Sequence, residues 1–75
     1  MTIREKFAKY TTEELENGVA RLTAKVAEAR EAMETFKAER NVEFYRMEEK
    51  HYNELVDMLL DAECALQGRK DRNEY

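Results

Sequence analysis

The feature that most constrains this chain is an unbroken series of apolar residues separated alternately by four and three positions. The series is Leu15, Val19, Leu22, Val26, Ala29, Met33 and Phe36. This spacing puts all seven side chains on one face of an α-helix, as in the a and d positions of a coiled coil. Such a face is stable only when it is buried against another helix, so the sequence predicts an all-α protein.

Threonines mark the starts of two helices. Thr2 and Thr11 each stand three residues before a glutamate, which is the spacing of a capping box, in which the two side chains satisfy free backbone amides. Thr2 predicts a short helix over about 3–10. Thr11 predicts a long helix over about 12–39, and this helix carries the apolar series.

A third helix is predicted over about 42–67, because apolar residues resume at Phe44. Its apolar face is broad, which indicates contact with more than one neighbour. The residues on this face are Phe44, Met47, Glu48, His51, Tyr52, Leu55, Val56, Met58, Leu59, Ala62 and Leu66. Gly68 is predicted to end the helix, since glycine readily adopts the left-handed conformation found there, and residues 69–75 are predicted to form a charged tail.

The connection between the two long segments decides the architecture. In a helical hairpin, residues 39–42 form a tight turn in which Asn41 caps both helices, and the two arms of similar length pack antiparallel. In the alternative, one helix runs over 12–67, about 85 Å at 1.5 Å per residue, with Arg40 interrupting its apolar face. The absence of Gly and Pro near residue 40 favours the single helix. The break in the apolar series favours the hairpin, which is the predicted fold of a single domain, 1–75.

A hairpin of this sequence is predicted to self-associate. One arm would leave Ala20, Ala24 and Ala27 uncovered, and the other would leave the flank of Tyr52, Val56 and Leu59 uncovered. Two hairpins forming a dimeric four-helix bundle would bury both surfaces. Only 14 of the 75 residues are Leu, Ile, Val or Phe, so a lone copy would have a small core. The residues predicted to carry assembly and partner binding are Val19, Leu22, Val26, Met33, Tyr45, Tyr52, Leu55, Val56 and Leu59.

Composition and charge narrow the class of protein. No apolar run approaches the roughly 20 residues of a membrane span, and the N-terminus lacks the apolar region of a secretory signal. A single cysteine, Cys64, cannot form a disulfide within the chain and is expected to be partly buried. We therefore expect a cytoplasmic protein. With only two glycines the sequence has no phosphate-binding loop, and no cofactor is expected.

Glu48 and His51 are the residues whose spacing is typical of a metal site. A Glu-x-x-His motif on each of two helices holds two metal ions in some helical bundles, together with a glutamate from each of two further helices. The apolar series on the other arm offers no such glutamate, so metal binding is kept as an alternative only. His51 is the single histidine, and Cys64 lies 13 residues along the helix, about 20 Å by helical rise. The chain is therefore predicted not to be an enzyme.

Basic residues near both ends of the chain give a second alternative. They are Arg4, Lys6, Lys9, Arg69, Lys70 and Arg72. A hairpin brings both ends together, and positive charge gathered there would face a nucleic-acid backbone. Against this, Glu5, Asp71 and Glu74 lie among them, and the net charge is −4.

Aromatic residues gather around the predicted turn. We expect Phe36 and Phe44 to be buried between the arms and Tyr45 to be exposed, where an aromatic side chain would contribute to a partner-binding tip. The predicted architecture resembles the helical-hairpin dimers found among small regulators of plasmids and phages, a likeness of form that assigns no residue a role. The predicted function is that of a non-enzymatic protein that self-associates and binds a host or cognate protein as a regulator or inhibitor.

Overall fold

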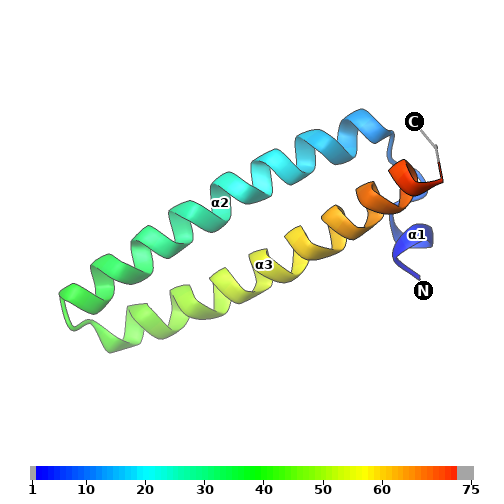
Figure 1. Cartoon of the computed structure of the whole chain (residues 1–75). Helices are drawn as coiled ribbons and strands as arrows, with labels where there is room; N and C mark the ends of the chain where they lie inside the picture. Colours follow the sequence, from blue (N-terminus) through cyan, green and yellow to red (C-terminus); the bar gives the residue numbers. More distant parts are fainter. Residues whose placement is uncertain (1, 73–75) are drawn as a thin grey trace.

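The computed structural model, which describes residues 2–72, is a hairpin of two long antiparallel helices with a single helical turn beside one end (Figure 1). Helix α1 spans Ile3–Lys6, α2 spans Thr12–Ala38 and α3 spans Val42–Asp71. No residue between 2 and 72 is in a strand. The long helices pack against each other. The predicted hairpin is therefore confirmed, and the single helix over 12–67 is wrong.

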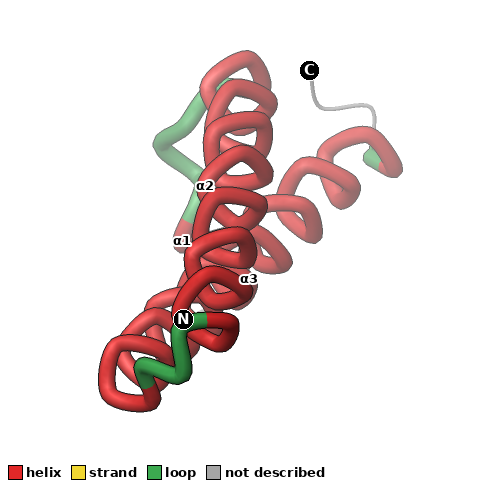
Figure 2. The backbone as a smooth tube through the Cα atoms, turned by 90° about the vertical axis from the view of Figure 1, so that its left-hand side faces the viewer, coloured by secondary structure: helices red, strands yellow, loops and turns green. Residues whose placement is uncertain are grey.

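The molecule is elongated and has a small core. It measures 48 × 22 × 17 Å, and its radius of gyration is 15.2 Å, whereas a compact chain of this length would have a radius of about 11 Å. Viewed from the turn, the long helices spread apart toward the opposite end (Figure 2). Among the described residues, the buried apolar side chains are Leu15, Ala29, Leu55, Ala62 and Ala65. Two of the five belong to α2 and three to α3, and all of them except Ala65 lie at the interface between these helices.

Helix α2 begins as predicted, at a complete capping box. The Glu14 backbone N–H donates to the Thr11 side chain at 3.1 Å, and the Thr11 backbone N–H donates to the Glu14 carboxylate at 3.0 Å. These two bonds satisfy amides that no helical carbonyl can reach. The extended backbone at Thr11 also separates α2 from the preceding segment.

The N-terminal helix is shorter than predicted. The Glu5 backbone N–H donates to the Thr2 hydroxyl at 3.2 Å, but α1 ends at Lys6 instead of continuing to about residue 10. The reason lies at Phe7, whose carbonyl accepts bonds from the Tyr10 amide at 3.0 Å and from the Arg69 guanidinium at 2.8 Å. A continuing helix would require that carbonyl to accept from the fourth residue along the chain. The contact with α3 therefore replaces the second helical turn.

The turn between α2 and α3 uses Arg40 where glycine is usual. Arg40 has a φ of 58°, in the left-handed region. Its N–H donates to the Lys37 carbonyl at 3.1 Å, and the N–H of Asn41 donates to the Phe36 carbonyl at 2.9 Å, which is the bonding pattern of a Schellman motif. The Asn41 side chain then accepts from the Phe44 amide at 3.4 Å and caps α3. The predicted N-cap is confirmed. The predicted C-cap role of Asn41 is wrong, because the C-cap of α2 is Glu39 and the left-handed residue is Arg40.

Helix α3 runs past Gly68, contrary to prediction. Gly68 has no positive φ, and its carbonyl accepts from the Arg72 amide at 3.1 Å, so the helix ends at Asp71. The Gln67 side chain donates to the Asp71 carboxylate at 3.0 Å, and this bond stabilises the last turn. Part of the predicted charged tail is therefore helical, while residues 73–75 lie outside the described part of the chain.

The predicted seam of α2 is confirmed, and so are Glu48, Tyr52, Leu55, Leu59, Ala62 and Leu66 of the predicted face of α3, whereas Phe44, Tyr45 and His51 are placed differently. On α2, Leu15 and Ala29 are buried, and the other five residues of the series are half-buried. On α3, the buried and half-buried residues include one continuous series with alternating steps of four and three. This seam series is Asn41, Tyr45, Glu48, Tyr52, Leu55, Leu59, Ala62, Leu66 and Arg69. Phe44 and His51, expected on the buried face, are exposed, and Tyr45, expected to be exposed, is half-buried. One residue along a helix is a rotation of about 100°, which accounts for the exchange.

Candidate interaction surfaces

A second series with coiled-coil spacing runs along α3, beside the one that faces α2, and three of its five members are apolar. We call it the outer stripe, and it consists of Phe44, Met47, His51, Glu54 and Met58. Its alternating steps of three and four put it about 100° around the helix from the seam series. Met47 is 62% exposed, Met58 52% and Phe44 49%. The hairpin therefore leaves a coiled-coil-like face of α3 open to solvent.

Helix α1 lies where the outer stripe would continue. The next residues at the same spacing are Asp61 and Ala65. The Lys6 ammonium lies 3.3 Å from the Asp61 carboxylate, and Ala65 is only 7% exposed. Figure 1 shows α1 beside the C-terminal part of α3, on the side away from α2. The structure thus covers one end of this face with α1 and leaves residues 44–58 of the stripe uncovered.

Arg69 fixes α1 in this place. Its guanidinium donates to the Phe7 carbonyl at 2.8 Å and lies 3.5 Å from the Thr12 hydroxyl, and the side chain is half-buried. One side chain therefore ties the segment after α1 and the start of α2 to the last turns of α3. Hydrogen bonds from a charged donor are among the stronger ones in proteins, which is consistent with a structural role for this arginine.

A groove lies at the turn of the hairpin. Its volume is about 450 Å³, and it is lined by Phe36, Lys37, Arg40, Asn41, Val42 and Tyr45. Val42 is 59% exposed. Phe36 also stacks on Phe44, with 5.6 Å between the ring centroids. The groove combines an apolar floor with two cationic side chains, in a chain whose net charge is −4.

Most of the predicted assembly residues hold the hairpin together. Leu55 is buried, and the others of that set are half-buried: Val19, Leu22, Val26, Met33, Tyr45, Tyr52, Val56 and Leu59. All of them except Val56 belong to the two series that form the seam. Ala20, Ala24 and Ala27 are exposed, as expected. The open apolar surface of α3 is therefore centred on Met47 and not on Val56. The signal that could have located it is the alternating spacing from Phe44 to Met58.

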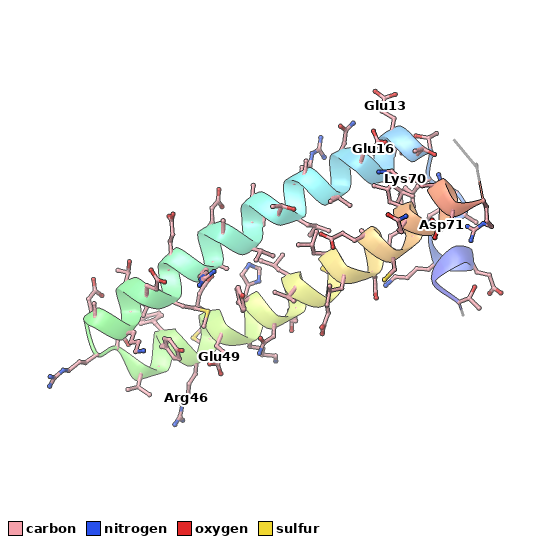
Figure 3. The ribbon with its side chains drawn as sticks, viewed as in Figure 1. Glu13, Glu16, Arg46, Glu49, Lys70 and Asp71 are labelled. Carbon is pink, nitrogen blue, oxygen red and sulfur yellow. The ribbon has the colours of Figure 1, made fainter. Side chains whose placement is uncertain are left out.

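The basic residues of the two chain ends come together but do not form a uniform basic surface. Lys6 is paired with Asp61, and its ammonium lies 5.5 Å from the Phe7 ring centroid, while Lys9 lies 5.6 Å from that of Tyr10. Figure 3 shows Glu13, Glu16 and Asp71 at the same end of the hairpin as Lys70. Arg72 caps α3, and the side chain of Arg4 lies outside the described part of the structure. A nucleic-acid backbone would meet mixed charge here.

The candidate metal and catalytic residues differ in their exposure to solvent. Glu48 is half-buried in the seam series, while His51 is exposed on the outer stripe and Cys64, contrary to expectation, is exposed as well. Within residues 2–72 no three His, Cys, Asp or Glu side chains are grouped so that they could hold a metal ion. None of the helices described has a stretch of sufficient length and apolarity to cross a membrane.

Comparison with family models, with curated proteins and with solved structures found no match for this chain. The geometry of the hairpin is therefore the basis for a functional proposal.

Proposed function

We propose that this protein is a non-enzymatic helical hairpin that self-associates and binds a protein partner as a regulator or inhibitor. The observation that carries the proposal is the outer stripe of α3, where Phe44, Met47 and Met58 remain about half exposed or more. Exposed apolar side chains at coiled-coil spacing are typical of a helix that packs against a further helix.

The surface area of a single copy supports self-association. The hairpin exposes 5878 Å², whereas a compact monomer of 8.9 kDa would expose about 4,800 Å². The excess, about 1,000 Å², is larger than the roughly 600 Å² per copy that a small specific interface buries. Covering the exposed halves of Phe44, Met47 and Met58 would contribute about 1 kcal/mol for each side chain.

The groove at the turn supports binding of a protein partner. Phe36, Val42 and Tyr45 offer it an apolar floor, and Lys37 and Arg40 add positive charge. Aromatic and arginine side chains are enriched among the residues that dominate binding energy at protein interfaces. A peptide or helix that inserts an apolar side chain next to a carboxylate would suit this groove.

The placement of the reactive side chains supports a non-enzymatic role. Cys64 and His51 both lie on α3, 13 residues apart, which is about 20 Å by helical rise. A nucleophile and its general base must be within hydrogen-bond reach of each other.

Self-association is tested by light scattering of the purified protein at concentrations from about 1 to about 100 μM. Weak helical dimers form in this concentration range. We expect the mass to rise from 8.9 kDa toward twice that value as the concentration increases. A mass of one copy throughout this range would contradict the proposal.

Partner binding is tested by photo-crosslinking in a lysate of the source organism, from a photo-reactive residue at position 37, which lines the groove. The Val42→Asp variant should lose the crosslinked species, because it places a charge in the apolar groove. It should still fold, since aspartate is favourable in the first turn of a helix. Leu60→Asp is the matched control, because Leu60 is also about half exposed on α3 but does not line the groove. A species captured equally by all three proteins would contradict binding at the groove.

A further inference from the structure

The outer stripe has a spacing and a charge pattern that fit a second copy of itself. We propose that two hairpins pair through α3 in antiparallel orientation, with Met47 of each copy against Met58 of the other. This inference rests on the proposed self-association and adds the face, the direction and the register of the contact.

The fold limits the length of α3 that a second copy can cover. On one side, α1 occupies the face at Asp61, where Lys6 forms its ion pair. On the other side, α3 begins at Val42. The open part of the face therefore runs from Phe44 to Met58, roughly 21 Å at 1.5 Å per residue. In the antiparallel register that brings Met47 against Met58, two such segments overlap from residue 47 to residue 58.

This overlap produces complementary layers. In antiparallel coiled coils, an a residue of one helix packs beside a d residue of the other. In this register, Met47 meets Met58 of the second copy and His51 meets Glu54, while Phe44 lies at the edge, across from Asp61. Each layer occurs twice because the two copies are related by a two-fold axis. The methionines thus meet each other, and the polar pair near the axis consists of a potential donor and a carboxylate.

The flanking charges select the same register. Lys50 and Asp57 are exposed and lie beside the outer stripe, on its side away from α2. In the Met47–Met58 register, Lys50 lies across from Asp57 of the second copy, and this contact also occurs twice. A shift by one heptad in one direction would bring Lys50 against Lys50, and a shift in the other direction would bring Asp57 against Asp57. Like charges in these positions oppose pairing.

Parallel pairing is disfavoured by the same residues. In a parallel pair with two-fold symmetry, every residue on the outer stripe meets its own copy, so Glu54 would face Glu54 and His51 would face His51. Antiparallel pairing replaces both contacts with His51–Glu54 pairs. It also places the two turn grooves at opposite ends of the dimer, where both remain open to partners.

A charge exchange between positions 50 and 57 tests the register. Lys50→Asp and Asp57→Lys should each weaken the dimer about tenfold, because each places like charges across the two-fold axis twice. The double variant restores both unlike pairs, and its dissociation constant should return to within about threefold of the original. Both positions are exposed, so circular dichroism should show unchanged helix content in all three proteins.

Substitutions on the stripe test the face. Met47→Asp should abolish the dimer and leave the hairpin folded, and the matched control Leu60→Asp, half exposed but off the stripe, should leave the mass unchanged. In a Cys64→Ser background, Met47→Cys combined with Met58→Cys should give a disulfide-linked dimer upon oxidation.

The outcomes separate this inference from the proposed function. If the unaltered protein dimerises but the double charge variant stays as weak as the single variants, or the two cysteines do not crosslink, the register is wrong and self-association stands. If Met47→Asp dimerises as well as the unaltered protein, the face is wrong. If the unaltered protein stays a monomer, self-association and this inference both fail.

Discussion

The two faces of α3 have residues at the same alternating spacing, but one face packs against α2 and the other is exposed to solvent. The seam series includes polar residues such as Asn41, Glu48 and Arg69, yet it is buried or half-buried. The outer stripe includes Phe44 and Met47, yet it is exposed. The difference shows that the apolarity of a helix face does not by itself decide which face packs within the chain. The turn and the apolar series of α2 together select the face of α3 that lies opposite.

Truncation on the seam should have the largest effect. Leu55 is buried at the centre of α3, and Leu55→Ala removes apolar contacts and leaves a cavity, so it should lower the free energy of unfolding by about 3 kcal/mol. Urea denaturation followed by circular dichroism measures the loss. Met47→Ala is the matched change on the outer stripe, and its effect should be below 1 kcal/mol when the protein is monomeric. Equal losses at the two positions would contradict the distinction between the faces.

Removal of the Arg69 side chain should extend the exposed part of the outer stripe. Arg69→Ala deletes the bonds to the Phe7 carbonyl and the Thr12 hydroxyl, which should cost about 2 kcal/mol of local stability. We expect amide hydrogens over residues 3–11 to exchange much faster, while those in the middle of α2 and α3 change little. If amide exchange became faster to the same extent along the whole chain, α1 would instead belong to the same cooperative unit as the hairpin.

Gly18→Ala should stabilise the hairpin and leave the outer stripe unchanged. Gly18 lies within α2 with helical φ, and a Cβ added there would meet no atom within 4 Å. Alanine has a lower entropic cost in a helix interior, so the free energy of unfolding should rise by about 0.5–1 kcal/mol. The measurement is again urea denaturation, at a concentration where the mass is that of one copy. A loss of stability would show that Gly18 is needed for a close approach.

The smallest effect is expected at Glu34. This side chain is exposed on α2, away from both faces of α3, and Glu34→Gln should change the unfolding free energy by less than 0.5 kcal/mol. It should also leave the dissociation constant of the dimer unchanged. The variant therefore serves as the baseline against which the other three changes are compared.

Local rules predicted much of this fold. The capping box at Thr11, the seam of α2 and the hairpin turn near residue 40 follow from hydrogen bonding and periodicity over a few residues. Most of the buried face of α3 followed as well, but the positions of Phe44 and Tyr45 did not, because two overlapping series share that helix, and Tyr45 belongs to one while Phe44 belongs to the other. The end of α1 did not follow either, since it depends on Arg69, which is 62 residues away in sequence from Phe7.

The sequence predicts the candidate surfaces only in part, because the exposure of a residue depends on how the two helices pair. The aromatic residues around the turn were noted from sequence, and Phe36 and Tyr45 do line the groove there. The exposed surface of α3 was assigned to Tyr52, Val56 and Leu59, of which Tyr52 and Leu59 lie in the seam. Which apolar residues remain exposed depends on the pairing of the two helices, and that pairing is a property of the whole chain.

The turn at Arg40 also has a consequence for the order in which the hairpin folds. Close to the turn, Phe36 and Phe44 meet across a loop of eight residues, whereas Thr12 and Arg69 at the far end are separated by 57. Closing the longer loop first would cost about 1.7 kcal/mol more in chain entropy. We therefore expect the contacts between α2 and α3 to form first near the turn and then progressively toward the chain ends. Substitutions near Arg40 should then mainly slow folding, while those near Arg69 should mainly speed unfolding.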